Sequence, residues 1–311
     1  MEIAINVVLT IVGLLMLCFG GNWLVSGGVA IAKKFRISNL VIGMTIVAYG
    51  TSTPELAASI AAAGEHSAII LGNIIGSNIA NVGMVIGIAA IIVPLAVSKS
   101  ILKKEIPIML GVSVLLILIS IDGEISQYDG ILLFAGLAVF AYYTFKDAMK
   151  QRAENKEKIE LGSKNIYLKS AGLIGIGVVL LYVGAILTVD NAVVLAQEFG
   201  LSEKIIGLTV IAIGTSLPEL ITSIIAIRKG HADIGIGNII GSNIYNILMI
   251  MGVGAVLGGV MVGADVYVDY AIMIIFSLSL LIALKTGFIG KAMGICLTIG
   301  YVAYLAVTFL K

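Results

Sequence analysis

Residues 37–56 read ISNLVIGMTIVAYGTSTPEL, and residues 201–220 read LSEKIIGLTVIAIGTSLPEL. These two stretches are identical at 11 of 20 positions. A second pair, LGNIIGSNIANVGMVIG at 71–87 and IGNIIGSNIYNILMIMG at 236–252, matches at 11 of 17 positions. The offsets are 164 and 165 residues, and the identities include Asn, Ser, Thr, Glu, Gly and Pro as well as apolar residues. The chain is therefore predicted to consist of two homologous halves.

The composition around these repeats is typical of a polytopic helical membrane protein. The 311 residues are 59% hydrophobic and 12% charged, with a mean hydropathy of +1.12, whereas soluble domains carry about 25% charged residues. The net charge of +1 indicates no nucleic-acid partner, and the lipid bilayer is the expected surrounding. Apolar stretches that reach the length of about 20 residues needed to cross a bilayer predict ten transmembrane helices, over residues 4–31, 39–63, 68–97, 104–121, 129–149, 166–196, 204–227, 233–259, 268–284 and 289–310.

The charges in the loops predict the orientation of these helices. Alternate loops hold 17 of the 19 Lys and Arg residues, and the positive-inside rule places that side in the cytoplasm of a cell-membrane protein. Both termini are then expected outside, with the polar stretch 150–165 as a cytoplasmic linker. The halves 1–149 and 166–311 carry five predicted spans each, and because five is odd they have inverted topologies. Inverted repeats with interrupted helices favour a secondary transporter whose site lies near the midplane.

The first repeated block predicts a broken helix that carries a carboxylate. Pro54 and Pro218 each remove a backbone donor and free the carbonyl four residues earlier, which belongs to Gly50 or Gly214 in this chain. Glu55 and Glu219 follow directly, deep in apolar spans, and no Lys or Arg lies deep inside any span to pair with them. A carboxylate at that depth requires a partner. Freed carbonyls, hydroxyls and two carboxylates are hard oxygen donors, which suit Ca2+ and Na+.

The second block adds polar residues that we expect opposite the two glutamates. Ser77 and Asn81 are four residues apart and share one helix face, as do Ser242 and Asn246. Asn73 and Asn78 fall elsewhere around the first of these helices and are expected to pin its ends.

The paired GTS-x-PE and GN-x-x-GSN-x-x-N blocks resemble the two alpha-repeats of the sodium/calcium exchanger family, within the wider Ca2+/cation antiporters. The blocks cover roughly a quarter of the chain, and the ten-helix plan extends the likeness to its whole length. The resemblance implies four ion sites at mid-membrane and sliding of the first helix of each half against the rest. Carried over by motif position, the metal-binding residues are Ala48, Thr51, Ser52, Glu55, Ser77, Asn81, Ala212, Thr215, Ser216, Glu219, Ser242 and Asn246, the alanines acting through their carbonyls.

The resemblance also separates branches of the superfamily. Asn246 stands where potassium-dependent relatives, and some prokaryotic ones, carry an aspartate. Proton/calcium antiporters carry Gly-Asn-Ala at the helix break, whereas this chain has Gly-Thr-Ser twice. The expected function is therefore exchange of Na+ for Ca2+ by alternating access, electrogenic if more than two Na+ replace one Ca2+. An H+/Ca2+ antiporter and a K+-dependent Na+/Ca2+ exchanger of the same fold are the alternatives.

Other classes of protein fit the sequence less well. A channel usually needs a continuous pore between symmetric subunits, whereas two inverted, broken helix pairs in one chain indicate alternating access by a monomer. An enzyme is not expected, because the spans hold no His or Cys ligand set and no nucleophile–base pair. No cofactor is expected beyond the transported ions. Asp190, a third acid inside a span, is left open between a structural role and a role where ions approach the site.

Overall fold

The computed structural model describes residues 2–64, 66–154, 165–200 and 212–310, and most of them are helical. Within these residues, seven helices are long and apolar enough to cross a membrane. They are Ile3–Phe35, Ser67–Ile92, Gln127–Ala153, Tyr167–Glu198, Ala232–Gly258, Val266–Thr286 and Lys291–Thr308.

The first half is built from α-helices, three short π-helical segments labelled η, and two short strands. Its elements are α1 (Glu2–Phe35), α2 (Asn39–Ile42), η1 (Gly43–Val47), α3 (Ala48–Thr51), α4 (Thr53–Ala62), α5 (Ser67–Ala80), η2 (Asn81–Ile86), α6 (Gly87–Ile92), β1 (Leu95–Ala96), η3 (Ile101–Glu105), α7 (Ile106–Ile119), β2 (Glu124–Ile125) and α8 (Gln127–Glu154).

The second half repeats this order where it is described, with η6 a short 3-10 turn. Its elements are α9 (Asn165–Glu198), α11 (Ala212–Thr215), α12 (Leu217–Arg228), α13 (Ala232–Tyr245), η5 (Asn246–Met251), α14 (Gly252–Gly258), β3 (Val260–Met261), α15 (Val266–Ser279), η6 (Leu280–Ile282), α16 (Ala283–Thr286), β4 (Phe288–Ile289) and α17 (Lys291–Leu310).

Three of the ten predicted spans are not among the seven long helices. The stretch 39–63 is divided into the short segments α2, η1, α3 and α4, and the stretch 104–121 is formed by the end of η3 together with α7. The stretch 204–227 begins in residues 201–211, which lie outside the described residues. The count of ten therefore stays a prediction.

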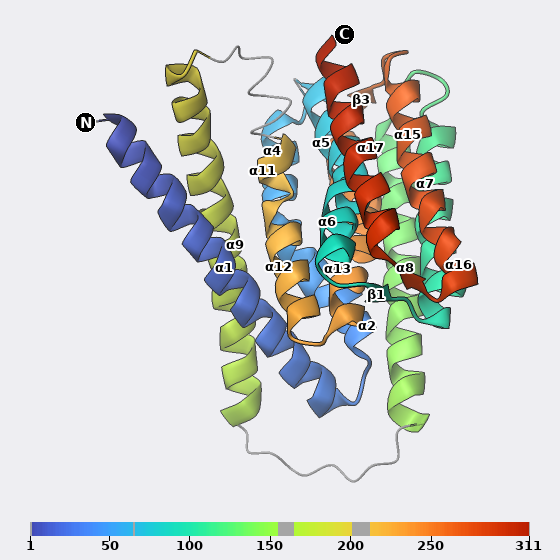
Figure 1. The fold of residues 1–311 in the computed structure, drawn as a ribbon. Helices are drawn as coiled ribbons and strands as arrows, with labels where there is room; N and C mark the ends of the chain where they lie inside the picture. Colours follow the sequence, from blue (N-terminus) through green and yellow to red (C-terminus); the bar gives the residue numbers. More distant parts are fainter. Residues whose placement is uncertain (1, 65, 155–164, 201–211, 311) are drawn as a thin grey trace.

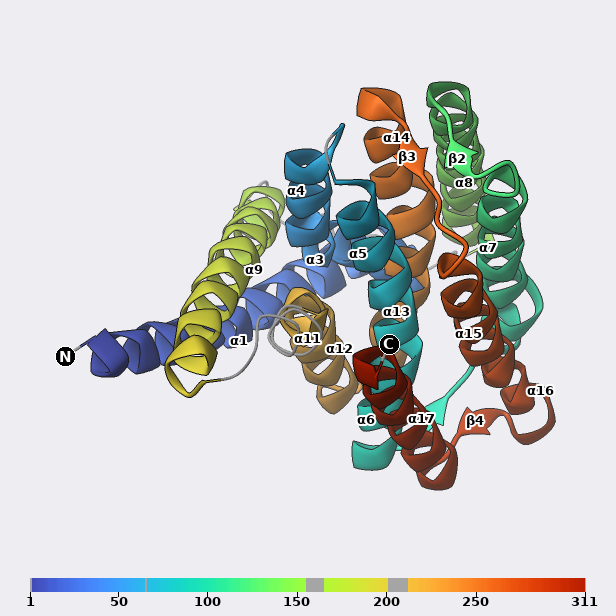
Figure 2. The same ribbon diagram turned by 90° about the horizontal axis from the view of Figure 1, so that it is seen from above.

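Two of the long helices form the centre of the bundle. The most apolar window of Ser67–Ile92 and that of Ala232–Gly258 are each 83% buried, against 17–33% in the other five. The remaining helices surround this pair, and α1 and α9 stand together at one side (Figure 1, Figure 2). The N-terminus and the C-terminus lie at the same end of the bundle (Figure 1).

Glycines set the contact between α1 and α9. A Cβ atom on Gly13 would lie 2.8 Å from the carbonyl oxygen of Gly184, and one on Gly20 would lie 2.8 Å from that of Gly177. Seven residues further along α1, a Cβ atom on Gly27 would lie 2.9 Å from the carbonyl oxygen of Ser170. The two helices therefore run antiparallel with their backbones in contact, as small residues allow in membranes.

Two short strand pairs join the halves outside the helices. Strand β1 pairs antiparallel with β4, with Leu95 opposite Ile289, and β2 pairs antiparallel with β3, with Ile125 opposite Val260. Each pair takes one strand from each half, so we call them the crossed clasps. Leu95, Ile125, Val260 and Ile289 are all buried, which anchors the clasps to the core of the bundle.

Candidate functional site

Both broken helices are interrupted at a serine that precedes the proline. Ser52 has φ −82° and ψ 9°, and Ser216 has φ −90° and ψ 3°, which places both in the bridge region outside the α-helical well. A new helix starts directly afterwards, with Pro54 or Pro218 in its first turn. Because proline has no N–H group, the carbonyl four residues earlier loses its helical donor. The breaks lie where the sequence predicts them.

Two buried carboxyl groups follow the breaks. Glu55 and Glu219 stand in the first turns of α4 and α12 and are 1% and 0% exposed. Ser52, three residues before Glu55, contacts Glu219 directly, so the two broken helices bring their acids to one buried region. Within the described residues, both oxygens of Glu55 and Oε2 of Glu219 are buried without a hydrogen-bond partner, and no lysine or arginine contacts either group. Acids buried in this way require a bound cation or a proton.

Hydroxyl groups from both halves meet around Glu219. Ser52 Oγ, on the first broken helix, donates to Glu219 Oε1 at 3.0 Å. Ser242 Oγ, on the central helix α13, donates to the same oxygen at 3.4 Å. Thr51 Oγ1 lies 3.5 Å from Ser242 Oγ. One carboxylate of the second half thus accepts hydrogen bonds from one element of each half, the broken helix of the first half and the central helix of the second.

Close backbone packing brings the first broken helix against α13. A Cβ atom on Gly241 would lie 2.6 Å from the carbonyl oxygen of Met44, and one on Gly43 would lie 2.5 Å from that of Ile234. Neither contact would leave room for a side chain. The glycines of both motifs therefore allow the close contact between the first broken helix and α13, and this contact places Thr51 beside Ser242.

The carbonyl of Ala48 lies at the same break. It accepts from the Ser52 N–H at 3.0 Å and from Thr51 Oγ1 at 3.3 Å. In the second half the Ser216 N–H donates instead to the carbonyl of Ile213 at 3.1 Å. The two breaks are thus similar in dihedral angles and different in hydrogen bonding.

The central helices change their winding at the predicted site asparagines. Asn81 is the first residue of η2 and Asn246 is the first residue of η5, so each begins a π-helical turn. π-Helical turns are rare in proteins, and those that do occur often lie at functional sites. Both side chains are 0% exposed, and the Oδ1 atom of each has no partner within the described residues.

The remaining predicted site residues are placed less completely. Ser77 is buried on α5, one turn before Asn81, and Ser216 Oγ is buried without a hydrogen-bond partner within the described chain. Thr215 is half-buried at the end of α11. Ala212 begins α11, and its side chain lies outside the description. Hydrogen bonds link Ala48, Thr51, Ser52, Glu219 and Ser242 to one another. Within the described residues, the hydroxyls of Ser77 and Ser216 form no hydrogen bond to this group.

The asparagines expected at the ends of the central helix lie elsewhere. Asn73 lies inside α5, where its Nδ2 donates to the carbonyl of Glu55 and to Ser59 Oγ, both at 3.0 Å. Its counterpart Asn238 donates to Ser223 Oγ at 3.0 Å and accepts from Thr51 Oγ1 at 3.0 Å. These residues fix the broken helices against the central ones. The repetition of Asn73 and Asn238 in the two blocks was the signal that could have predicted this role.

Asp190 lies on α9 near the site and at the protein surface. It is exposed and lines a surface groove that also reaches Pro54 and Thr215. Its position is compatible with either of the roles that the sequence leaves open.

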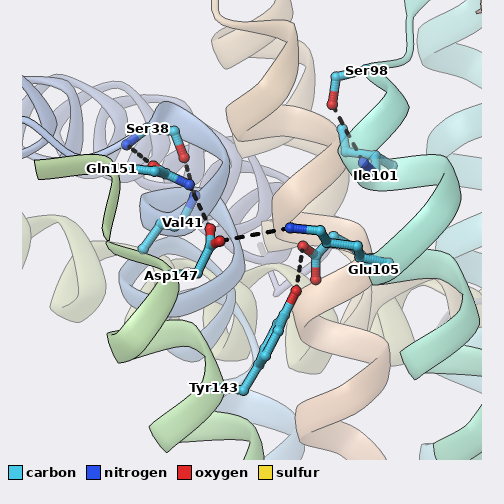
Figure 3. A network of polar contacts seen from close by, with 9 residues as sticks. Ser38, Val41, Ser98, Ile101, Glu105, Tyr143, Asp147 and Gln151 are labelled. Carbon is cyan, nitrogen blue, oxygen red and sulfur yellow. Dashed lines mark hydrogen bonds and ion pairs between the residues drawn. The ribbon is translucent and has the colours of Figure 1, made fainter. Parts of the chain in front are cut away.

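A second polar cluster, away from the site, contains an acid that the sequence analysis missed. Glu105 is 3% exposed and accepts from the hydroxyl of Tyr143 at 3.3 Å (Figure 3). The neighbouring Lys104 forms an ion pair of 3.8 Å with Asp147 on α8. Gln151 then connects α8 to the backbone N–H of Ser38 at 2.9 Å. Glu105 follows two lysines in the sequence, which makes it look like an interfacial residue.

Long apolar helices around a buried, oxygen-rich acidic centre define an integral membrane ion transporter. Comparison with known proteins gives the family. The sequence model of the sodium/calcium exchanger protein family matches residues 5–146 and 169–310. The chain belongs to this family, as the two repeated blocks predict.

Individual relatives match over the full length. The inner membrane protein YrbG of Escherichia coli is 36% identical, covering 97% of this chain and 96% of that protein. The sodium/calcium exchanger MaX1 of Methanosarcina acetivorans is 33% identical, with 99% of each chain covered. A solved structure of the sodium-calcium exchanger NCX_Mj, soaked with Na+ and Sr2+, superposes with a TM-score of 0.86 at 35% identity, covering 98% of this chain and 99% of the other.

Proposed function

We propose that this protein is a secondary active antiporter that exchanges Na+ for Ca2+ across the cell membrane. The observation that carries the proposal is the meeting of Glu55 and Glu219, from the two repeated motifs, in a buried centre without a cationic partner. Two carboxylates balance the charge of one Ca2+ ion. The names of the relatives MaX1 and NCX_Mj support the same pair of ions.

The donor atoms around the two acids support hard cations. Hydroxyls of Thr51, Ser52 and Ser242 and the amide oxygens of Asn81 and Asn246 are all oxygen ligands, which Ca2+ and Na+ prefer. We assign the ion ligands to the twelve residues named from the sequence. Na+ ions compete with Ca2+ for overlapping oxygens of this set, and the neutral side chains at 81 and 246 leave only two carboxylates.

The architecture proposed is ten transmembrane helices in two inverted halves, 1–149 and 166–311, joined by a cytoplasmic linker at 150–165, with both termini outside. The interrupted helices at Ser52 and Ser216, and the position of both ends of the chain at one end of the bundle (Figure 1), support it. The basic loops support the orientation. The protein works as a monomer, since both halves of the site come from one chain.

The movement proposed is sliding of the first helix of each half, α1 and α9, against the rest. The packing of these two helices on each other through glycines at one side of the bundle supports their moving as a pair. Alternating access then opens the site to one side at a time, and the bound ions compensate the two acids while the site is closed.

Radiolabelled Ca2+ uptake into proteoliposomes tests the proposal. The vesicles are loaded with NaCl, KCl or choline chloride, with and without an imposed pH gradient. We expect uptake to require internal Na+ and to ignore the pH gradient. Uptake that follows the pH gradient without Na+ would instead identify an H+/Ca2+ antiporter of the same fold, and uptake that needs K+ together with Na+ would identify the K+-dependent type.

A further inference from the structure

Four asparagines, two from each half, cross the contact between the central helices. Asn81 Nδ2 of the first half donates to Asn243 Oδ1 of the second half at 2.9 Å. In the same way, Asn246 Nδ2 of the second half donates to Asn78 Oδ1 of the first half at 3.0 Å. The four side chains are at most 1% exposed. The repeated motif GSN-x-x-N therefore makes both of its contacts across the two halves.

Asn78 and Asn243 are themselves held by a reciprocal pair of bonds. Asn78 Nδ2 donates to the backbone carbonyl of Asn243 at 3.3 Å, and Asn243 Nδ2 donates to the carbonyl of Asn78 at 3.4 Å. The same amides reach the sulfur atoms of Met273 and Met109, at 3.8 and 3.6 Å. These methionines are also counterparts in the repeat, 164 residues apart. Each amide plane is thereby fixed by contacts on its donor side and its acceptor side.

This arrangement decides which way the site amides face. An asparagine side chain can present either its NH2 group or its oxygen in a given direction, and its partners select between them. Because Asn78 and Asn243 offer a carbonyl oxygen, the NH2 groups of Asn246 and Asn81 turn toward them. The Oδ1 atoms of Asn81 and Asn246 are then turned away from these contacts, and both are buried without a partner within the described residues.

We infer that Asn78 and Asn243 are positioning residues that hold the amide oxygens of Asn246 and Asn81 toward the transported cation. The inference deepens the proposed function and rests on it for the identity of the cation. Asn78 and Asn243 are not ligands themselves, because their carbonyl oxygens and amide groups are already engaged. They act as the supporting shell of the site, in the way that outer partners orient the ligands of a metal ion.

The experiment is a double-mutant cycle on the full chain, with wild type, Asn78→Ala, Asn246→Ala and the double variant. Two quantities are measured on the purified protein. The first is the thermal midpoint of unfolding in detergent with chelator and without Na+, and the second is the half-saturating Ca2+ concentration and maximal rate of exchange in proteoliposomes. The cycle with Asn243→Ala and Asn81→Ala repeats the test in the other half if the first set does not fold.

We expect Asn78→Ala to raise the half-saturating Ca2+ concentration by about 10- to 100-fold, as loss of an orienting partner does at metal sites, with a smaller change in maximal rate. In the Asn246→Ala background the same substitution should change it little further. The thermal midpoints should likewise be non-additive, since each single variant already breaks the hydrogen bond that Asn78 and Asn246 share. Met273→Leu, which removes the sulfur contact and keeps the bond to Asn246, is the control and should keep the wild-type Ca2+ dependence.

Additive effects in both quantities would overturn the inference. So would an Asn78→Ala variant with lower stability and maximal rate but an unchanged half-saturating Ca2+ concentration, because that pattern describes a purely structural residue. Wild-type protein that transports Ca2+ under no condition would refute the proposed function instead. In that case non-additive thermal midpoints in chelator would still show that the asparagines are linked, and additive ones would refute the link as well.

Discussion

Ser52 Oγ of the first half donates to Glu219 Oε1 of the second half at 3.0 Å, whereas its counterpart Ser216 Oγ is buried without a partner in the part of the chain that is described. The two homologous halves thus treat their acids differently. Glu219 is held by hydroxyls, and both oxygens of Glu55 are left without a hydrogen bond to the described residues. In this conformation Glu55 is the acid with unused acceptor capacity on both oxygens.

This asymmetry predicts different costs for the two serines. In the absence of Ca2+ and Na+, Ser52→Ala should destabilise the protein by about 1 kcal/mol, because it removes a hydrogen bond to a buried carboxyl group. Ser216→Ala is the matched control and should cost less, since its hydroxyl has no partner to lose. Thermal unfolding in detergent with chelator measures both variants. Equal destabilisation by the two substitutions would contradict the asymmetry.

Neutralising either site acid should abolish Ca2+ exchange. We expect Glu219→Gln and Glu55→Gln to lower Ca2+ uptake by about 100-fold or more, because removing one partner of a buried charge pair costs about 3 to 5 kcal/mol. Uptake of radiolabelled Ca2+ into Na+-loaded proteoliposomes measures this. Glu105→Gln is the control, since Glu105 is also a buried acid but lies in the cluster with Tyr143 (Figure 3). Retained Ca2+ flux in Glu219→Gln would refute the ligand assignment.

The neutral amide at position 246 predicts independence from K+. Exchange by the wild type should not change when K+ replaces choline at constant ionic strength. Asn246→Asp adds a third carboxylate to the site, and we expect it to make exchange dependent on K+. The rate of Ca2+ uptake against external K+ concentration tests both statements. Stimulation of the wild type by K+ would move the protein to the K+-dependent branch.

Exchange of more than two Na+ for one Ca2+ should carry current. A membrane potential acts on each net charge with about 2.3 kcal/mol per 100 mV. Ca2+ uptake against Na+ efflux should therefore be faster in vesicles held positive inside than in vesicles held negative inside, with the potential set by a K+ gradient and valinomycin. Rates that do not respond to the potential would show an electroneutral stoichiometry.

A histidine beside the first helix predicts a pH effect on stability. Burial lowers the pKa of His231 below its usual 6.5, with further lowering by the charges of Lys33 and Lys229. The ring Nδ1 of His231 lies 3.4 Å from Asn39 Nδ2. When the imidazole is neutral, this Nδ1 can accept a hydrogen bond from the Asn39 amide. Because the folded protein binds this proton more weakly than the unfolded chain, the neutral ring stabilises the fold fully above about pH 6.5, and that stability is lost as the pH falls below it.

His231→Gln keeps an acceptor and cannot titrate in this range. We therefore expect the thermal midpoint of the variant to fall less steeply than that of the wild type between about pH 6.5 and 5. Identical slopes for the two proteins would mean that His231 makes no contribution to acid sensitivity.

The sequence predicted the family and the breaks, and it did so through polar residues. Glu55 and Glu219 are informative because an acid inside a membrane span is costly unless it has a partner. The family assignment based on the motifs that contain them is confirmed. Helical periodicity gave the face of α5 that holds Ser77 and Asn81. It could not give the partner of Asn78, because periodicity describes positions around one helix and the partner lies on another helix 165 residues away.

Other features escaped for related physical reasons. Glu105 follows Lys103 and Lys104, and its burial depends on how η3 packs against α8. The strands of the crossed clasps are two residues each, which is too short for an alternation of apolar and polar residues to predict them. The expectation that Asn73 and Asn78 pin helix ends was wrong, since both lie within α5 and bond to other elements.

The crossed clasps have a consequence for how the protein is made. Leu95 can pair with Ile289, and Ile125 with Val260, only after the later residue has been synthesised. The first half therefore emerges from the ribosome with two strand edges that only later residues can cover. During synthesis these edges stay unpaired in the nascent chain until most of the second half has been inserted. The two halves, although descended from one repeated sequence, therefore mature as a single interlaced unit, and neither is a finished product on its own.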